Sequence, residues 1–124
     1  MTIQEVIDRQ QMLYPHQYGE DTVIKWLDII DRRIYNNLIL THEGSEEITF
    51  DGYTAADKGK TLIVPDEYDV YRYWLDAQTS YANRDISAYN NAISQFNNEY
   101  KSYANSYNRD HMRISANKFK YDRG

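Results

Sequence analysis

The sequence predicts a mostly α-helical protein. We expect a small helical bundle with a short β-hairpin or extended insertion at about residues 47–64 and an extended C-terminal arm. Two long stretches carry apolar residues at the i, i+3, i+4 spacing of a helix, and a polar stretch containing three glycines separates them. At 124 residues the chain is long enough for one domain. We divide it into a helical domain at 1–112 and a basic arm at 113–124.

The first predicted helix covers about residues 2–13. Thr2 and Glu5 are three residues apart and precede Val6, which is the pattern of a capping box. Pro15 ends this helix, because proline lacks an amide donor and disfavours helical backbone in the residue before it.

A second helix is predicted at about 21–41, with acidic residues near its N-terminus. Its apolar stripe contains Val23, Trp26, Leu27, Ile30, Ile34, Leu38 and Ile39. Asp28 and Asp31 are three residues apart on this helix, and we interpret them as part of a solvated face rather than as a catalytic pair. Trp26 and Trp74 are expected to anchor the core.

Between the helical stretches, two short runs have strand character. Residues 47–50 and 61–64 are β-branched, aromatic or aliphatic, and Asp51-Gly52 is a favoured tight-turn dipeptide. A two-stranded ribbon is only marginally stable unless it packs on helices. The sequence therefore leaves a β-hairpin and an extended insertion open.

The longest stretch, 66–110, follows Pro65, a residue favoured in the first turn of a helix. Its apolar stripe is Tyr71, Leu75, Gln78, Ala82, Ile86, Tyr89, Ile93, Phe96, Tyr100, Tyr103 and Tyr107. The spacing is irregular near Asn83 and Asp85, where asparagine can end one helix and aspartate can cap the next. One bent helix would be about 70 Å long. We favour two antiparallel helices, 66–82 and 85–110, because they bury more area.

Composition and charge restrict the class of protein. Residues 113–124 carry a net charge of +3, which leaves −8 on residues 1–112 of a chain with −5 overall. Such an acidic body argues against a free nucleic-acid-binding protein, which needs clustered lysine and arginine. The thirteen tyrosines suit surfaces that become buried on assembly. Asn90 and Asn97 have poor helix propensity, so they belong either to an exposed polar face or to hydrogen bonds between subunits.

No catalytic, cofactor or metal site is expected. The chain contains no cysteine, and its histidines, His16, His42 and His111, are far apart in the sequence. Phosphate-binding, zinc-protease and nucleophile-elbow motifs are absent from the sequence. It contains no run of eighteen apolar residues and no signal-peptide pattern at its start, so we expect a soluble, non-enzymatic protein made in the cytoplasm.

A series of motifs then points to a family. The motifs, each weak alone but specific in their order, are Trp26-Leu27-Asp28-Ile29-Ile30-Asp31, Phe50-Asp51-Gly52-Tyr53, Leu62-Ile63-Val64-Pro65 with Tyr68, Tyr81-Ala82-Asn83, Tyr89-Asn90-Asn91, Phe96-Asn97 and Tyr107-Asn108-Arg109-Asp110-His111-Met112. Together they resemble the small head–tail connector (adaptor or neck) proteins of tailed phages and prophages of Gram-positive bacteria. The chain departs from that pattern at Arg84, where glycine is common, and at Asp110, where threonine is common.

The resemblance implies a structural protein of the virion neck. Such a protein forms a ring, typically of about twelve copies, beneath the portal, joins it to a further neck or tail protein, and lets the genome pass on ejection without sequence-specific binding. The subunit interface would use the tyrosine-rich and asparagine-rich faces, with candidates Tyr81, Tyr89, Asn90, Asn97, Tyr100, Tyr103 and Tyr107. The arm would reach the portal or a neighbouring copy through Arg113, Lys118, Phe119, Lys120 and Tyr121. The alternative is a small helical regulatory or DNA-binding module.

Overall fold

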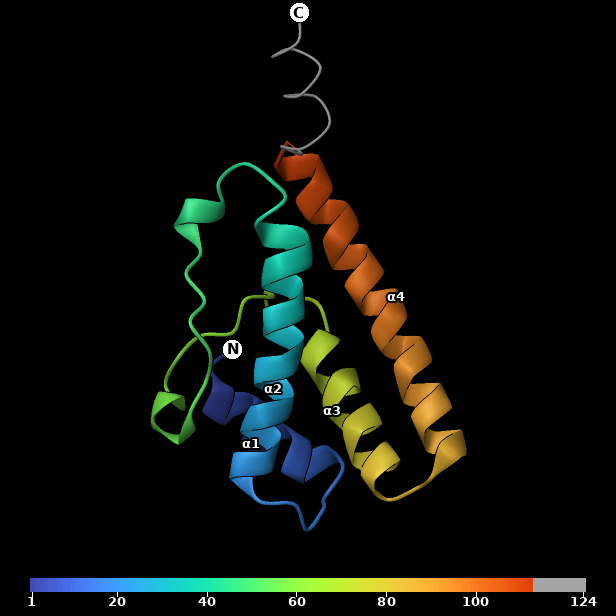
Figure 1. The fold of residues 1–124 in the computed structure, drawn as a ribbon. Helices are drawn as coiled ribbons and strands as arrows, with labels where there is room; N and C mark the ends of the chain where they lie inside the picture. Colours follow the sequence, from blue (N-terminus) through green and yellow to red (C-terminus); the bar gives the residue numbers. More distant parts are fainter. Residues whose placement is uncertain (113–124) are drawn as a thin grey trace, which may run out of the picture.

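The computed structural model describes residues 1–112, and this part of the chain contains four α-helices (Figure 1). They are α1 (Ile3–Leu13), α2 (Glu20–Ile34), α3 (Val70–Ala82) and α4 (Ile86–Asp110). The prediction of a mostly helical bundle is confirmed. The predicted basic arm at 113–124 lies outside the described residues.

The start of α1 follows directly from its first residues. The Glu5 amide donates to the Thr2 hydroxyl at 3.2 Å, and the Thr2 amide donates to the Glu5 carboxylate at 3.0 Å, so the predicted capping box is formed. The hydrogen bonds from Thr2 lower the pKa of Glu5. The helix ends at Leu13, two residues before Pro15, as the sequence predicts.

The second helix is longer than its α-helical part. After Ile34 the chain continues through a π-helical turn, η1 (Tyr35–Ile39), in which the Leu40 amide bonds to the Tyr35 carbonyl at 2.9 Å. A π turn contains one extra residue, and here both Leu38 and Ile39 are buried. The combined element agrees with the predicted helix at 21–41 to within two residues at each end.

The segment between η1 and α3 is an irregular insertion, and the predicted β-hairpin is not formed in the described residues. It contains two short 3₁₀ turns, η2 (Ser45–Glu47) and η3 (Ala55–Asp57). The two apolar runs do not pair with each other because the second run has other partners. Thr61 forms an isolated antiparallel bridge with Thr2, and the amides of Ile63 and Val64 donate to side chains of α2 and α3.

The long C-terminal stretch forms two helices, as we favoured. However, α3 begins at Val70, four residues later than predicted, because Pro65 starts a separate turn closed by the Tyr68 amide at 3.2 Å. The amide of Asp69, the residue before the helix, donates to the Glu99 carboxylate of α4 at 2.8 Å. This side-chain partner fixes where α3 starts, and its position could not be read from the sequence.

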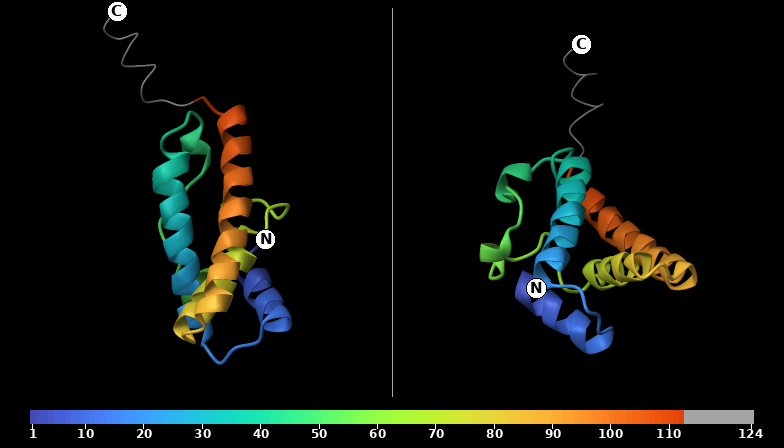
Figure 2. Two further views of the ribbon diagram at one scale, coloured as in Figure 1. Left: turned by 90° about the vertical axis from the view of Figure 1, so that its right-hand side faces the viewer. Right: turned by 60° about the horizontal axis from the view of Figure 1, so that its bottom comes forward.

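The four helices are arranged around the α3–α4 hairpin. In Figure 1, α2 and α4 approach each other near the end of α4 and spread apart toward the α3–α4 turn. The α1 helix packs against both α2 and α3, at the end of the bundle away from the C-terminus of α4 (Figure 2). The core lies mainly among α1, α2 and α3, whereas the 25 residues of α4 contribute only three buried side chains, those of Phe96, Tyr103 and Tyr107. Much of α4 is therefore left uncovered.

Candidate subunit interface

An exposed apolar surface of the helical bundle lies at the α3–α4 turn. The side chains of Tyr81 and Ile86 are 70% and 71% exposed, and the Tyr81 ring lies 5.6 Å from that of Tyr89. They border a hollow, called here the turn hollow, which is lined by Tyr81, Ala82, Arg84, Asp85, Ile86, Tyr89 and Asn90. A contiguous exposed apolar patch of this kind is typical of an interaction site.

The turn itself is tightly specified by backbone hydrogen bonds. The Arg84 amide donates to the Tyr81 carbonyl at 3.0 Å and the Asp85 amide donates to the Ser80 carbonyl at 2.9 Å, which is the Schellman arrangement. Arg84 has a left-handed φ of 59°. The Asp85 carboxylate then caps α4 by accepting from the Ala88 amide at 3.1 Å. This turn holds Tyr81 and Ile86 at the surface.

Next to the turn hollow, a groove runs between the diverging parts of α2 and α4. This α2–α4 groove is lined by Ile29, Arg33, Trp74, Gln78, Tyr81, Tyr89, Ile93, Phe96 and Asn97. Trp74 is buried, its indole N–H donates to the Trp26 carbonyl at 2.8 Å, and its ring lies 5.3 Å from Phe96. Ile29 is 40% exposed although it borders this aromatic surface. The groove therefore combines aromatic and aliphatic side chains with the polar side chains of Arg33, Gln78 and Asn97, and it is open to solvent.

Besides Tyr81, four of the predicted interface residues are exposed or half-buried. Asn90 and Asn97 are exposed and, being seven residues apart, lie on the same face of α4. Tyr89 and Tyr100 are half-buried. Burial raises the pKa of Tyr100, so its hydroxyl is neutral at physiological pH.

Two further candidates, Tyr103 and Tyr107, are core residues of the chain itself. Each is 6% exposed; the Tyr103 ring lies 5.4 Å from Tyr68 and the Tyr107 ring 5.3 Å from His42. We remove both from the predicted interface. The sequence could not distinguish them from Tyr89, because all three lie on the same apolar stripe of α4. Only the second half of this stripe is covered by other parts of the chain.

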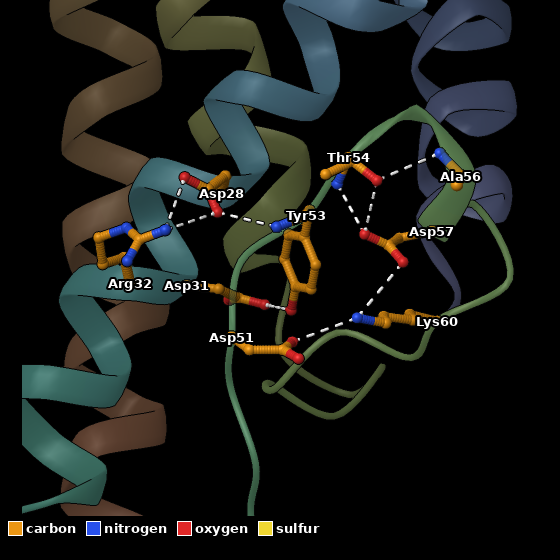
Figure 3. Close-up of polar contacts among 9 residues, drawn as sticks. All are labelled: Asp28, Asp31, Arg32, Asp51, Tyr53, Thr54, Ala56, Asp57 and Lys60. Atoms are coloured by element: carbon orange, nitrogen blue, oxygen red, sulfur yellow. Dashed lines mark hydrogen bonds and ion pairs between the residues drawn. The ribbon is translucent and has the colours of Figure 1, made fainter.

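The interpretation of Asp31 as a solvated residue is wrong. Its side chain is fully buried and accepts hydrogen bonds from the hydroxyls of Tyr53 and Tyr71 (the latter at 2.6 Å) and from the Ile63 amide at 3.2 Å. Figure 3 shows Tyr53 directed at Asp31 from the insertion. Burial raises the pKa of Asp31 to about 6 despite these three donors.

Asp28 lies beside this network and holds the turn at Gly52. Its carboxylate accepts from the Tyr53 amide at 2.9 Å and pairs with Arg32 at 3.2 Å (Figure 3). Gly52 has a φ of 95°, and a Cβ there would lie 3.2 Å from Arg32 Nη2 and 3.3 Å from Asp28 Oδ1. Glycine is required for both reasons. The Asp28–Asp31 pair thus ties the insertion to α2 and α3.

The remainder of the insertion is held by its own polar contacts. The Thr54 and Asp57 side chains form a capping box at η3, and the Lys60 ammonium lies 3.2 Å from Asp51 and 3.3 Å from Asp57 (Figure 3). These hydrogen bonds lower the pKa of Asp57 and raise that of Lys60. The contacts lie at the surface and contribute to the shape of the loop.

Two histidines meet at the other end of the bundle, which the sequence did not predict. His42 is buried; Nδ1 lies 2.6 Å from the Leu38 carbonyl and Nε2 contacts the Asn108 side chain. His111 stacks on Tyr107 with ring centroids 3.9 Å apart, and Tyr107 also contacts His42. These contacts, with a 2.8 Å hydrogen bond from the Glu43 amide to the Met112 carbonyl, hold the ends of η1 and α4 together.

Sequence reasoning missed the α2 side of the groove. Ile29 and Arg33 lie outside the predicted apolar stripe, and Trp74 is predicted to anchor the core. One signal was available: Ile29-Ile30 places two isoleucines side by side on a helix, so only one of them can lie on the buried stripe. The divergence of α2 and α4 that exposes the other is a tertiary feature.

Comparisons of the chain with protein-family models, with curated proteins and with solved structures find no match. Within residues 1–112, no group of three or more histidine, aspartate or glutamate side chains is arranged to hold a metal ion. None of the helices in this range is sufficiently long and apolar to cross a membrane. We take the turn hollow together with the α2–α4 groove as the candidate site, because the exposed side chain of Tyr81 lines both of them.

Proposed function

We propose that this protein is a structural head–tail connector of a tailed phage. It assembles into a ring beneath the portal, joins the capsid to the tail and leaves a channel for the genome. The protein performs no catalysis; its function lies in its surfaces. It acts in the neck of the virion, with the portal and a further neck or tail protein as partners.

The observation that carries the assembly part of this proposal is the uncovered half of the α3–α4 hairpin. Tyr81 and Ile86 are more than two-thirds exposed, and the groove beside them has an aromatic floor. Burying large apolar side chains of this size is worth about 1.5–3 kcal/mol each. The ordered α3–α4 turn keeps Tyr81 and Ile86 at the surface. Their burial by a neighbouring subunit would therefore stabilise the assembly.

Support for the connector part comes from where the family-like motifs lie. Motifs at 26–31, 50–53 and 62–65 are separated in the sequence, yet all three contribute to the hydrogen-bond network of Asp31. The residues that carry the resemblance therefore specify one common structural element. A shared element of this kind favours a shared fold over a chance similarity of short motifs.

The charge of the body fits a channel for DNA. Residues 1–112 carry a net charge of −8, and acidic walls repel phosphate, so a passing genome would not adhere. The same charge disfavours the alternative of a DNA-binding module, which needs a basic recognition face.

Imaging and mass measurement test the proposal. The full chain is expected to form rings of one copy number when mixed with the portal protein encoded beside its gene, as seen by negative-stain microscopy and native mass spectrometry. A chain that stays monomeric with and without that portal protein overturns the proposal. Specific binding to a duplex DNA fragment at physiological salt would instead favour the regulatory module.

A second experiment addresses the basic arm. Deleting 113–124 is expected to abolish docking to the portal, because it removes a +3 segment from a chain whose remainder is acidic. Circular dichroism should show the helical content of residues 1–112 retained. Undiminished docking of the truncated chain would refute the role of the arm.

A further inference from the structure

The α2–α4 groove and the turn hollow carry more positive than negative charge in an otherwise acidic domain. Arg33 lines the groove with its guanidinium 5.7 Å from the Trp74 ring, and Arg84 lines the turn hollow, where Asp85 is engaged in capping α4. Lys101 follows Asn97 by one helical turn on the exposed face of α4. None of the ion pairs formed within residues 1–112 involves these three cations.

The outward face of α1 has the complementary character. Asp8 and Met12 are exposed and four residues apart, and Leu13 adjoins Met12 at the end of the helix. Glu5 lies one turn before Asp8 with its carboxylate held in the capping box, and Arg9 pairs with Asp69 at 3.4 Å, so Asp8 is the carboxylate that this face offers to a partner. Met12 is 79% and Leu13 51% exposed, which makes this the second exposed apolar site on the helices. Asp8 hydrogen-bonds to Gln4 at 2.8 Å and forms no ion pair within the described residues.

These two surfaces are separate parts of the molecule. The α1 helix packs against α2 and α3, and none of its residues lines the groove that opens between α2 and α4. A contact between two different patches is heterologous, so each copy that uses its groove still presents its α1 face to the next copy. Repetition of such a contact produces a closed ring or an open filament, whereas a self-complementary patch would stop at a dimer.

We propose that the α1 face of one copy, formed by Asp8, Met12 and Leu13, docks in the α2–α4 groove of the next copy. Met12 and Leu13 cover the aromatic floor beside Trp74, and Asp8 faces Arg33. This inference rests on the proposed function in one respect, since both require copies of this chain to associate.

The positive charge of the groove favours the α1 face as its occupant over the C-terminal segment of a neighbouring copy. The C-terminal segment 113–124 carries +3 and would place its cations against Arg33, Arg84 and Lys101. Like charges brought together at an interface cost several kcal/mol. An acidic helix with an apolar end meets both the charge and the hydrophobic character of the groove.

Disulfide trapping tests the contact directly, because the natural chain has no cysteine. Met12→Cys and Ile29→Cys are combined in one full-length chain; both positions are exposed, so the fold should be retained. Under mild oxidation, with and without the portal protein, the double variant should give a ladder of covalent multimers. Each single variant can give at most a dimer.

A matched pair, Met12→Cys with Thr49→Cys, controls for random collision, because Thr49 is exposed in the insertion rather than at the groove. If microscopy shows rings but the Met12→Cys/Ile29→Cys variant gives no more covalent multimers than this control, the proposed contact between α1 and the groove is wrong. The connector function would still stand. A ladder without binding to the portal would support the docking and count against the connector function. A monomeric chain with no ladder would reject both.

Charge reversal gives an independent measurement by sedimentation equilibrium. Asp8→Arg and Arg33→Glu are each expected to weaken self-association by about tenfold, and the two together to restore most of it. Additive weakening in the double variant, with helical circular dichroism unchanged, would exclude this pairing of the two surfaces.

Discussion

At the scale of single residues, the most informative side chain is the buried carboxylate of Asp31. It has no cationic partner within the described residues, yet three donors from the insertion and α3 converge on it. Removing one partner of such a group leaves a buried polar atom unsatisfied, which costs about 1–3 kcal/mol. Asp31 therefore connects α2 to the insertion and to α3. Because burial disfavours the ionised carboxylate, ionisation of Asp31 lowers the stability of the fold.

This effect gives the protein a characteristic pH dependence. The pKa of Asp31 is raised from 3.8 to about 6 by burial. Protonation of Asp31 therefore contributes fully to the free energy of unfolding below pH 3.8, and this contribution is lost as the pH rises through 6. Between pH 4 and pH 7 the free energy of unfolding should fall by about 2 kcal/mol through this residue alone.

Urea unfolding of Asp31→Asn at several pH values checks this prediction. As the pH rises from 4 to 7, the natural chain should lose about 2 kcal/mol of unfolding free energy relative to Asp31→Asn, because the asparagine does not ionise. Glu67→Gln, which removes an exposed carboxylate, should show no such trend. A constant difference for Asp31→Asn would mean that the carboxylate keeps its ordinary titration in the fold.

At the scale of elements, the α3–α4 turn illustrates how a local motif can form from an unfavourable residue. Arg84 occupies the left-handed position of the Schellman motif, which is usually glycine. The hydrogen bonds on both sides of the turn hold the arginine in this conformation.

We expect Arg84→Gly to be more stable than Arg84→Ala by about 1 kcal/mol, because alanine keeps the strain of the left-handed backbone and glycine does not. Both substitutions remove the same charge and the same exposed side chain, so their difference isolates the backbone effect. Thermal or urea unfolding of the two variants measures it. Equal stability would indicate that the turn adopts another conformation in solution.

At the scale of the whole molecule, the four helices form a bundle that is closed at one end and open at the other. The contacts of His42 and Tyr107 hold α2 and α4 together near residue 108, and the α2–α4 groove separates them near the turn. The first half of α4 is consequently supported mainly by α3. Assembly is the physical reason we offer for leaving this half uncovered.

Hydrogen exchange should report this asymmetry. In the monomer, amides of residues 86–95 are expected to exchange faster than those of 96–107, because local opening of the first half exposes fewer buried contacts. In the assembled state the first half should gain protection more than the second. Equal protection from exchange along the whole of α4 in the monomer would contradict the conclusion that its first half is uncovered.

Much of the fold could be predicted from the sequence because its signals are local. The Thr2–Glu5 capping box, the stop at Pro15 and the cap at Asp85 depend on residues a few positions apart, and all three appear in the structure. Helical periodicity likewise identified α2 and the division of the last stretch into α3 and α4. The sequence by itself thus determined the helical class, the approximate helix bounds and the exposed aromatic candidates near the turn.

Only the tertiary structure decided which of these side chains are buried. Tyr89 and Tyr107 share one stripe, but the contacts of His42 cover Tyr107 whereas the divergence of α2 leaves Tyr89 half-exposed. Asp31 resembles a surface residue in its sequence context, and three donors from residues 22, 32 and 40 positions away make it a core residue. Burial is set by packing between segments distant in the chain, and helical spacing carries no information about which segments meet.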